Sequence, residues 1–441
     1  MKNKNLNDVI NKLTNDKNNA VSIVFNNAKL NDRGILSNYI FTIKDNYADT
    51  NVACRASSLF LKTFKPQYKA TALKLLEEAG AACVARTNLD EFGLAGSGEH
   101  SAYGLIKNPL NAQYLVGGSS SGAAATFYDE IDFAIGSDTG DSVRKPASNI
   151  GQIGFKPSYG AISRYGLFAY ASSLDTVAYF THNIEDLIKI SSVLYKKDFQ
   201  NDMTSIDLSF DYNDIKEIKP LKIAYLNCFD KLSPSVAFAY KKLLEKLKKE
   251  NIELIEIQED EKLFNSIDVI YKVISFSEAS SNLANLTGVA FGQRKEEKDW
   301  TETFIKTRSQ YLGKMVKSRL ILGSLFLENE NQIKYFVKAK KLRRILANHF
   351  TKIHESADLF IYPASNDIAS KINETPKYQS YLDFILTYAN LVGNPSLTMK
   401  LGVDKETLMP FNIAVDTKIY HDTKLFAHSL YLKKILEDIN E

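Results

Sequence analysis

The sequence predicts an α/β fold, and the order of its apolar segments supports this prediction. Short apolar runs typical of buried strands occur within 132–148 and 358–364. They alternate with stretches such as 70–93 and 235–257, in which apolar residues first recur at helical spacing and a short strand then follows. Because alternating strands and helices bury the faces of a sheet, we expect one sheet whose edges feed the loops.

The other expected elements continue this pattern. The segment 35–47 reads as a strand that runs into a polar turn carrying Lys44. Further strands are expected at 221–227 and 407–416, and further helices at 6–16, 273–286, 310–350 and 424–436.

The composition is that of an ordinary folded protein. Of 441 residues, 44% are hydrophobic and 24% are charged. The 25 Phe and 23 Tyr residues supply enough buriable surface to exclude general disorder. A net charge of +3 gives no sign of nucleic-acid or membrane binding by bulk electrostatics. We expect one domain over 1–441, with a short helical segment at about 1–20 and a surface connection at about 199–219.

The three cysteines, Cys54, Cys83 and Cys228, favour a reducing environment. No two have the spacing of metal ligands, and an odd, sparse set does not suggest a disulfide framework, so no metal site is expected. The first residues lack the apolar core of a signal peptide, and no run approaches the ~18 apolar residues of a membrane helix. The sequence therefore predicts a cytoplasmic protein that does not enter the membrane.

Two loops rich in glycine and serine stand close together in the sequence, at 117–122 and 136–142. Each precedes an expected helix N-terminus, where backbone N–H groups can hold an anion or an oxyanion. A nucleotide-binding loop does not fit, because Ala123 and Ala124 stand where the Walker pattern has Lys and Ser or Thr. Taken alone, such a loop is most often only a turn.

The loops are two of five segments that occur in a fixed order along the chain. The segments are TIKDN (42–46), TNLDEFGLAGSGEHSAYG (87–104), VGGSSSGAAA (116–125), GSDTGDSVRKPAS (136–148) and GFKPSYGAISRYGLFAYASSLDTV (154–177). In this series the chain resembles the amidase signature family. The resemblance implies a large mixed, mostly parallel central sheet covered by helices on both faces. It also implies a catalytic triad of Lys44, Ser119 held by a cis peptide bond, and the nucleophile Ser142.

Elementary chemistry agrees with a triad of this kind. A serine hydroxyl attacks an amide only when a base removes its proton. None of the six histidines lies in the motifs, whereas a lysine can act as the base if burial disfavours its charged form. Ser119 then relays the proton from Ser142 to Lys44. Two plainer interpretations stay open, with Lys44 as a surface lysine and Ser142 as a helix N-cap. The family's oxyanion hole maps onto the backbone N–H groups of Thr139, Gly140, Asp141 and Ser142.

Segments further along the chain narrow the resemblance to one branch of the family. KPSYGAISRYGLFAYASSLD (156–175), SFSEASSNLANLTGVAFG (275–292), GKMVKSRLILGS (313–324) and ILTYANLVGNPSLTM (385–399) are similar to the A subunits of bacterial glutamyl-tRNA(Gln) amidotransferases. The resemblance implies a glutaminase that hydrolyses glutamine through an acyl-enzyme and needs no cofactor of its own. The ammonia then serves a B subunit, which uses ATP and Mg²⁺ on Glu-tRNA(Gln), and a C subunit completes a heterotrimer.

The residues that meet glutamine in that branch map onto Tyr271 and Arg319, with Arg319 gripping the α-carboxylate. Arg319 could instead be a helix-surface arginine, and Tyr271 a core aromatic. The acid expected for the α-amino group aligns with Phe384, and a shift by one residue gives Asp383.

Two further departures from the family pattern affect the loops. Asp141 and Ser121 stand where glycine is usual, and Asp141 adds charge beside a developing oxyanion. Three hypotheses follow: a glutaminase subunit, a stand-alone amidase acting on another small amide, and a scaffold subunit whose site Asp141 has impaired.

Overall fold

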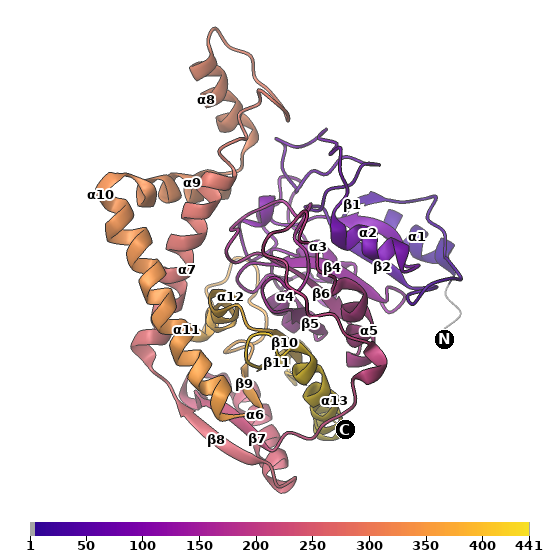
Figure 1. Ribbon diagram of the computed structural model, residues 1–441, viewed down its shortest axis with the longest axis vertical. Coiled ribbons are helices and arrows are strands. Elements are labelled where there is room, and N and C mark those ends of the chain that lie inside the picture. Colours follow the sequence, from indigo (N-terminus) through magenta and orange to yellow (C-terminus); the bar gives the residue numbers. More distant parts are fainter. Residues whose placement is uncertain (1–4, 441) are drawn as a thin grey trace.

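The computed structural model describes residues 5–440, and through them runs one mixed sheet of eleven strands. The strands are ordered β1-β3-β2-β4-β6-β5-β10-β11-β9-β7-β8 across the sheet (Figure 1). They are β1 (Val21–Val24), β2 (Ile40–Lys44), β3 (Ala82–Thr87), β4 (Phe133–Asp138), β5 (Ile153–Lys156), β6 (Thr176–Thr181), β7 (Lys222–Asn227), β8 (Glu253–Gln258), β9 (Leu359–Pro363), β10 (Ser396–Val403) and β11 (Pro410–Asp416).

The expectation of a mixed sheet is confirmed, but the expectation that its strands are mostly parallel is wrong. Four neighbouring pairs are parallel: β2 with β3, β2 with β4, β7 with β8, and β7 with β9. The other six of the ten neighbouring pairs are antiparallel. Apolar runs in the sequence reveal units in which a helix connects two parallel strands, but not how strands from distant segments pair in the middle of the sheet.

Helices cover both faces of this sheet, as expected. They are α1 (Leu6–Thr14), α2 (Thr71–Glu78), α3 (Ser121–Ala125), α4 (Arg144–Ile150), α5 (Ile184–Leu194), α6 (Pro234–Lys249), α7 (Glu261–Asn282), α8 (Trp300–Tyr311), α9 (Lys314–Leu327), α10 (Asn329–Asn331), α11 (Lys338–Ser356), α12 (Tyr388–Val392) and α13 (Asp422–Asn440). Neighbouring residues of β5 show the two faces: a Cβ on Gly154 would meet Ala147 of α4, whereas the ring of Phe155 packs edge-on against Phe426 of α13.

Three features match the sequence expectations to different degrees: the N-terminal segment, the connection at 199–219 and the end of strand β2. The expected N-terminal helical segment contains α1, while residues 1–4 of it lie outside the described part of the chain. Residues 199–219 contain one short 3₁₀ turn, Tyr212–Asp214. Lys44 ends strand β2 and is fully buried, so its expected place in a polar turn is wrong. Strand β2 therefore includes Lys44, although a lysine side chain is more typical of an exposed turn.

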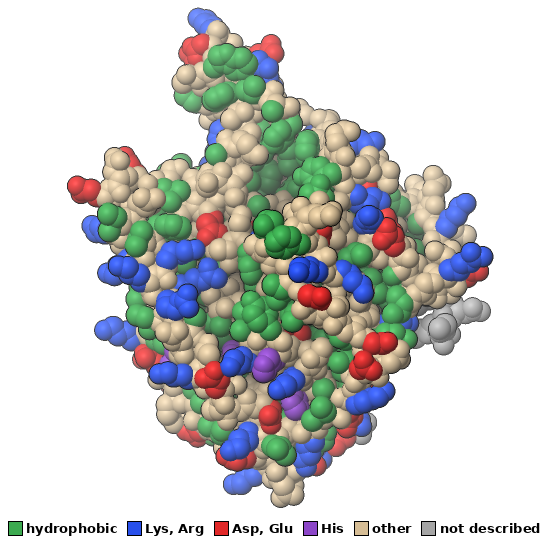
Figure 2. Space-filling model, in the orientation of Figure 1, with side chains coloured by type: hydrophobic (Ala, Val, Ile, Leu, Met, Phe, Trp, Pro, Cys, Tyr) green, Lys and Arg blue, Asp and Glu red, His purple; other side chains and the backbone are tan. Residues whose placement is uncertain are grey.

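Helices α7, α9 and α11 pack beside the sheet, and α8 projects beyond them at the top of Figure 1. Apolar side chains gather at this projecting tip in Figure 2, among them Trp300, Phe304 and Ile305, which are 57%, 36% and 57% exposed. Among the described helices, none is both long and apolar enough to cross a lipid bilayer.

Candidate active site

Lys44 lies on strand β2, which is third in the order of the sheet and is flanked by β3 and β4. Its Nζ donates hydrogen bonds to the Oγ atoms of Ser119 at 2.7 Å, Ser137 at 2.9 Å and Ser120 at 3.0 Å. Ser120 gives its own hydrogen to the Ser137 carbonyl at 3.1 Å, and Ser137 Oγ also accepts from Asn46 at 3.1 Å. Ser119 is therefore the nearest hydroxyl that can pass a proton to a neutral lysine.

This environment makes the neutral form of Lys44 accessible. Burial lowers the pKa of Lys44 to about 7, against the opposing effect of the carboxylates of Asp90, Asp138 and Asp175. An ordinary lysine is almost entirely protonated at neutral pH, whereas roughly half of the Lys44 side chains are neutral at a pH equal to that value. Lys44 thus has the proton affinity that a base needs near neutral pH.

Ser119 and Ser142 come from the two glycine- and serine-rich loops, which pack against each other. Ser119 follows the cis peptide bond Gly118–Ser119 and lies just before α3. Ser142 lies between β4 and α4, and its carbonyl accepts a hydrogen bond from the N–H of Ser120 at 3.1 Å. Lys44, Ser119 and Ser142, far apart in sequence, are therefore gathered at the same end of strands β2 and β4.

The turn that joins β4 to α4 is held by a buried ion pair. Asp138 Oδ2 accepts the N–H of Val143 at 3.0 Å, and Val143 is the N-cap residue of α4, so the N-cap interpretation of Ser142 is wrong. Arg144 Nη2 lies 3.0 Å from Asp138 Oδ1 and donates to the Gly140 carbonyl at 2.8 Å. Because Arg144 holds the Gly140 carbonyl, it fixes the orientation of the adjoining peptide groups, which belong to the predicted oxyanion hole.

A second carboxylate supports the same turn from the segment just before β6. Asp175 Oδ1 accepts a hydrogen bond from Thr139 Oγ1 at 2.7 Å, and Oδ2 accepts from the N–H of Tyr170 at 3.0 Å. Burial raises the pKa of Asp175 to about 6, although these hydrogen bonds act in the opposite direction. Asn390 of α12 adds two bonds of 3.0 Å to Asp138, one to its carbonyl and one to its carboxylate.

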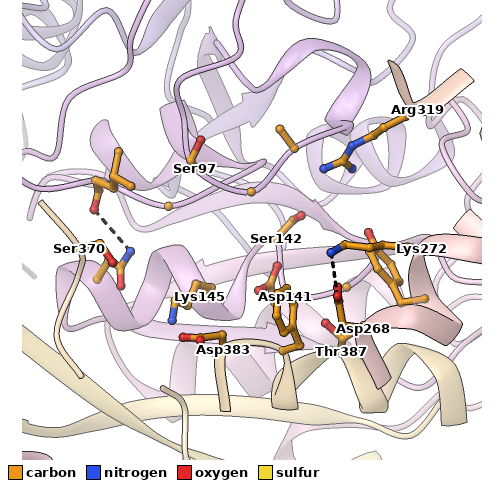
Figure 3. A pocket seen from close by; sticks show the side chains of 18 of the residues that line it. Ser97, Asp141, Ser142, Lys145, Asp268, Lys272, Arg319, Ser370, Asp383 and Thr387 are labelled. Carbon is orange, nitrogen blue, oxygen red and sulfur yellow. Dashed lines mark hydrogen bonds and ion pairs between the residues drawn. The ribbon is translucent and has the colours of Figure 1, made fainter. Parts of the chain in front are cut away.

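A cavity of about 290 Å³ opens onto this turn, and Ser142, Tyr271, Arg319 and Asp383 all line it. Figure 3 shows Ser142 and Asp141 in the middle of the cavity, with Arg319 reaching in from α9. The structure thus brings the three predicted substrate contacts and the predicted nucleophile to one small pocket.

Tyr271 and Arg319 approach the turn from α7 and α9. A Cβ on Gly140 would lie 3.1 Å from the ring of Tyr271, so a larger residue at this position would require the ring to shift by a few tenths of an ångström. Arg319 Nη1 donates to the Tyr170 hydroxyl at 3.1 Å, and its guanidinium lies 5.0 Å from the Phe276 ring centroid. Its Nε is buried without a hydrogen-bond partner among the described residues, while the residue as a whole lines the cavity.

The residues that depart from the family pattern differ in their surroundings. Asp141 is partly buried and faces the cavity. Ser121 is buried at the start of α3, and its Oγ has no hydrogen-bond partner among residues 5–440. Phe384 lines the cavity next to Asp383 and is 39% exposed. Both positions considered for the amino-group contact therefore border the cavity.

Sequence reasoning missed the residues that support the triad. Ser120 and Ser137 surround Lys44, while Asp138, Arg144 and Asp175 hold the turn. All five lie inside the motif segments, so the signal was present, but a motif does not tell a supporting side chain from a reacting one. The described residues bring together no group of three or more His, Cys, Asp or Glu that could hold a metal ion.

Known proteins share both the sequence pattern and the fold of this chain. The family model described as Amidase matches residues 2–426. The A subunit of glutamyl-tRNA(Gln) amidotransferase from Mycoplasma genitalium is 35% identical over 93% of this chain and 88% of its own length. The protein of the same name from Leptospira interrogans serovar copenhageni is 36% identical, over 90% of this chain and 82% of its own length.

Solved structures agree with these relatives. The crystal structure of the Thermotoga maritima protein of that name superposes with a TM-score of 0.80 at 27% identity, covering 97% of this chain and 91% of that one. A crystal structure of an amidase with 22% identity reaches 0.78 over 97% of this chain and 95% of its own, which supports the fold alone. The chain belongs to the amidase signature family, and these named relatives within it are the A subunits of amidotransferases.

Proposed function

We propose that this protein is the glutamine-hydrolysing subunit of a glutamyl-tRNA(Gln) amidotransferase. The observation that carries the proposal is the buried hydrogen bond of 2.7 Å from Lys44 to Ser119, beside a pocket lined by Ser142. Support also comes from relatives that share the name of such a subunit over most of their length.

In the proposed reaction, Ser142 Oγ attacks the side-chain amide carbon of glutamine. Ser119 takes the proton of Ser142 while giving its own to Lys44, whose lowered pKa makes the neutral form available near neutral pH. The N–H groups of the turn 139–142, Asp141 among them, stabilise the oxyanion. The C–N bond then breaks, ammonia leaves with the proton returned through the same relay, and water hydrolyses the γ-glutamyl ester to glutamate.

The proposed substrate contacts follow from the lining of the pocket. Arg319, whose side chain lines the pocket, binds the α-carboxylate of glutamine, and Tyr271 closes the pocket over Gly140. Asp383, predicted from the sequence to meet the α-amino group, borders the same pocket. The pocket therefore offers a cation for the carboxylate of a small amino acid and carboxylates for its ammonium group.

The proposed complex contains B and C subunits, with the B subunit using ATP and Mg²⁺ to activate Glu-tRNA(Gln) and accept the ammonia. Exposed apolar side chains on α8 and α9, such as Trp300 and Ile321, are suited to contact such partners. A cytoplasmic location fits the free thiols of Cys54, Cys83 and Cys228.

The test is ammonia release from glutamine by the full chain, assembled with its B and C subunits. Ser142→Ala is expected to lower the rate by about 10⁴-fold or more, because no other group can form the acyl-enzyme. Hydroxylamine is expected to trap γ-glutamyl hydroxamate with the wild type only. Equal ammonia release by wild type and Ser142→Ala would support an impaired scaffold instead.

The same assay separates this proposal from a stand-alone amidase. The proposed subunit is expected to speed up when ATP and Glu-tRNA(Gln) are added to the complex. A stand-alone amidase turns over at full rate as an isolated chain, and addition of partners, ATP and tRNA leaves that rate unchanged.

A further inference from the structure

Glutamine places two demands on the pocket at almost the same point. Its α-ammonium and α-carboxylate groups are bonded to one carbon, so the protein groups that bind them must be neighbours. Arg319 provides for the carboxylate, as proposed above. Three carboxylates line the pocket and compete for the ammonium: Asp141, Asp268 and Asp383.

Two of these carboxylates are already engaged. Asp268 Oδ2 lies 2.7 Å from Lys272 Nζ one helical turn away, so its charge is paired. Asp383 Oδ2 accepts the N–H of Ser380 at 3.2 Å as part of a capping box. Figure 3 shows Asp383 and Arg319 on opposite sides of the pocket, with Asp141 between them.

Asp141 meets both requirements. It adjoins the nucleophile in sequence, and Figure 3 shows it between Asp383 and Arg319 in the middle of the pocket. Burial, followed by the charge of Asp138, raises the pKa of Asp141 to about 6, while Lys145, Arg144 and Arg319 act in the opposite direction. The charge of Arg319 thus acts on the Asp141 side chain and lowers its pKa.

Among the nearby cations, Lys145 lines the same pocket and its charge acts on Asp141, whereas two others have partners of their own. Arg144 is committed to Asp138 and to the Gly140 carbonyl, and Lys272 to Asp268. A nearby cation stabilises the charged form of a partly buried carboxylate, and the ammonium group of the substrate is such a cation.

We propose that Asp141 binds the α-ammonium group of glutamine and makes the site selective for amides that carry this group. The inference rests on the proposed glutaminase function and refines it. The carboxylate that departs from the family pattern is then a specificity determinant of this site, and the scaffold hypothesis loses its main support.

The test measures binding to the full chain in a Ser142→Ala background, where no turnover occurs. Isothermal titration compares L-glutamine with 4-carbamoylbutanoate, which has the same amide and carboxylate but no amino group. Asp141→Asn is expected to weaken glutamine binding at least tenfold and binding of the analogue less than threefold. Asp141→Gly, which restores the residue usual in the family, is expected to give the same loss of selectivity.

Asp268→Asn is the matched control and is expected to change glutamine binding less than threefold. The proposal is overturned if Asp141→Asn and Asp141→Gly weaken both ligands equally, or if Asp383→Asn alone removes the selectivity. Ammonia release by the wild-type complex distinguishes a deeper failure: if glutamine is not hydrolysed at all, the proposed function is wrong and the inference with it.

Discussion

Two buried cations on neighbouring segments, Lys44 and Arg144, are treated in opposite ways by this fold. The hydrogen-bond partners of Lys44 Nζ are three hydroxyls and, at 3.5 Å, the Ser137 carbonyl, all neutral, and burial lowers its pKa to about 7. Burial also opposes the charge of Arg144, but the adjacent Asp138 outweighs it and the pKa of Arg144 is raised. A buried cation next to a carboxylate stays charged and holds structure, whereas one among neutral oxygens can become a base.

A third buried cation shows that a lowered pKa alone does not make a base. Burial lowers the pKa of Lys156 to about 7 as well, followed by the repulsion of Arg144. Lys156 Nζ donates to the carbonyl of Pro157 at 2.8 Å. What sets Lys44 apart is the serine relay at its side.

The largest expected effect separates Lys44 from Lys156. Lys44→Met removes the proposed base and is expected to lower kcat for glutamine hydrolysis by about 10³-fold or more. Lys156→Met replaces an equally buried amine and is expected to keep kcat within about threefold. Steady-state ammonia release measures both variants. Similar losses of kcat in Lys44→Met and Lys156→Met would mean that both lysines act structurally, and Lys44 would not stand out as the base.

The next effect concerns stability. Arg144→Met leaves the carboxylate of Asp138 buried without its partner and is expected to lower the free energy of unfolding by about 3–5 kcal/mol. The urea midpoint reports this change. Adding Asp138→Asn to the same chain is expected to recover part of the loss, because the unpaired charge is removed. A loss below about 1 kcal/mol in Arg144→Met argues against a structural ion pair.

The smallest effect is the pH dependence of the wild type. Neutral Lys44 is the proposed base, and its neutral fraction grows as the pH rises through its pKa of about 7. At saturating glutamine, kcat is expected to rise with pH, to be roughly a tenth of its plateau at pH 6, and to level off above about pH 8. A kcat that stays constant from pH 5.5 to 8 contradicts a lysine base with this pKa.

Much of the fold and the site could be predicted because the relevant signals are local. The strands and helices around 70–93, 132–148 and 235–257 follow from apolar spacing over a few residues. The order of the motif segments predicted Lys44, Ser119 and Ser142 as the triad. The antiparallel middle of the sheet could not be predicted in this way, because β5 pairs with β10, a segment far along the chain.

The sequence by itself determined which residue types stand in the motifs, and hence the class of chemistry expected of the site. Only the tertiary structure decided what each polar group faces. It buried Lys44 against Ser119, Ser120 and Ser137, and it left Asp141 open to the pocket while pairing Asp138 with Arg144. The reason is physical: burial and the charge of the nearest partner set a proton affinity, and the groups that surround Lys44 come from segments distant in the sequence.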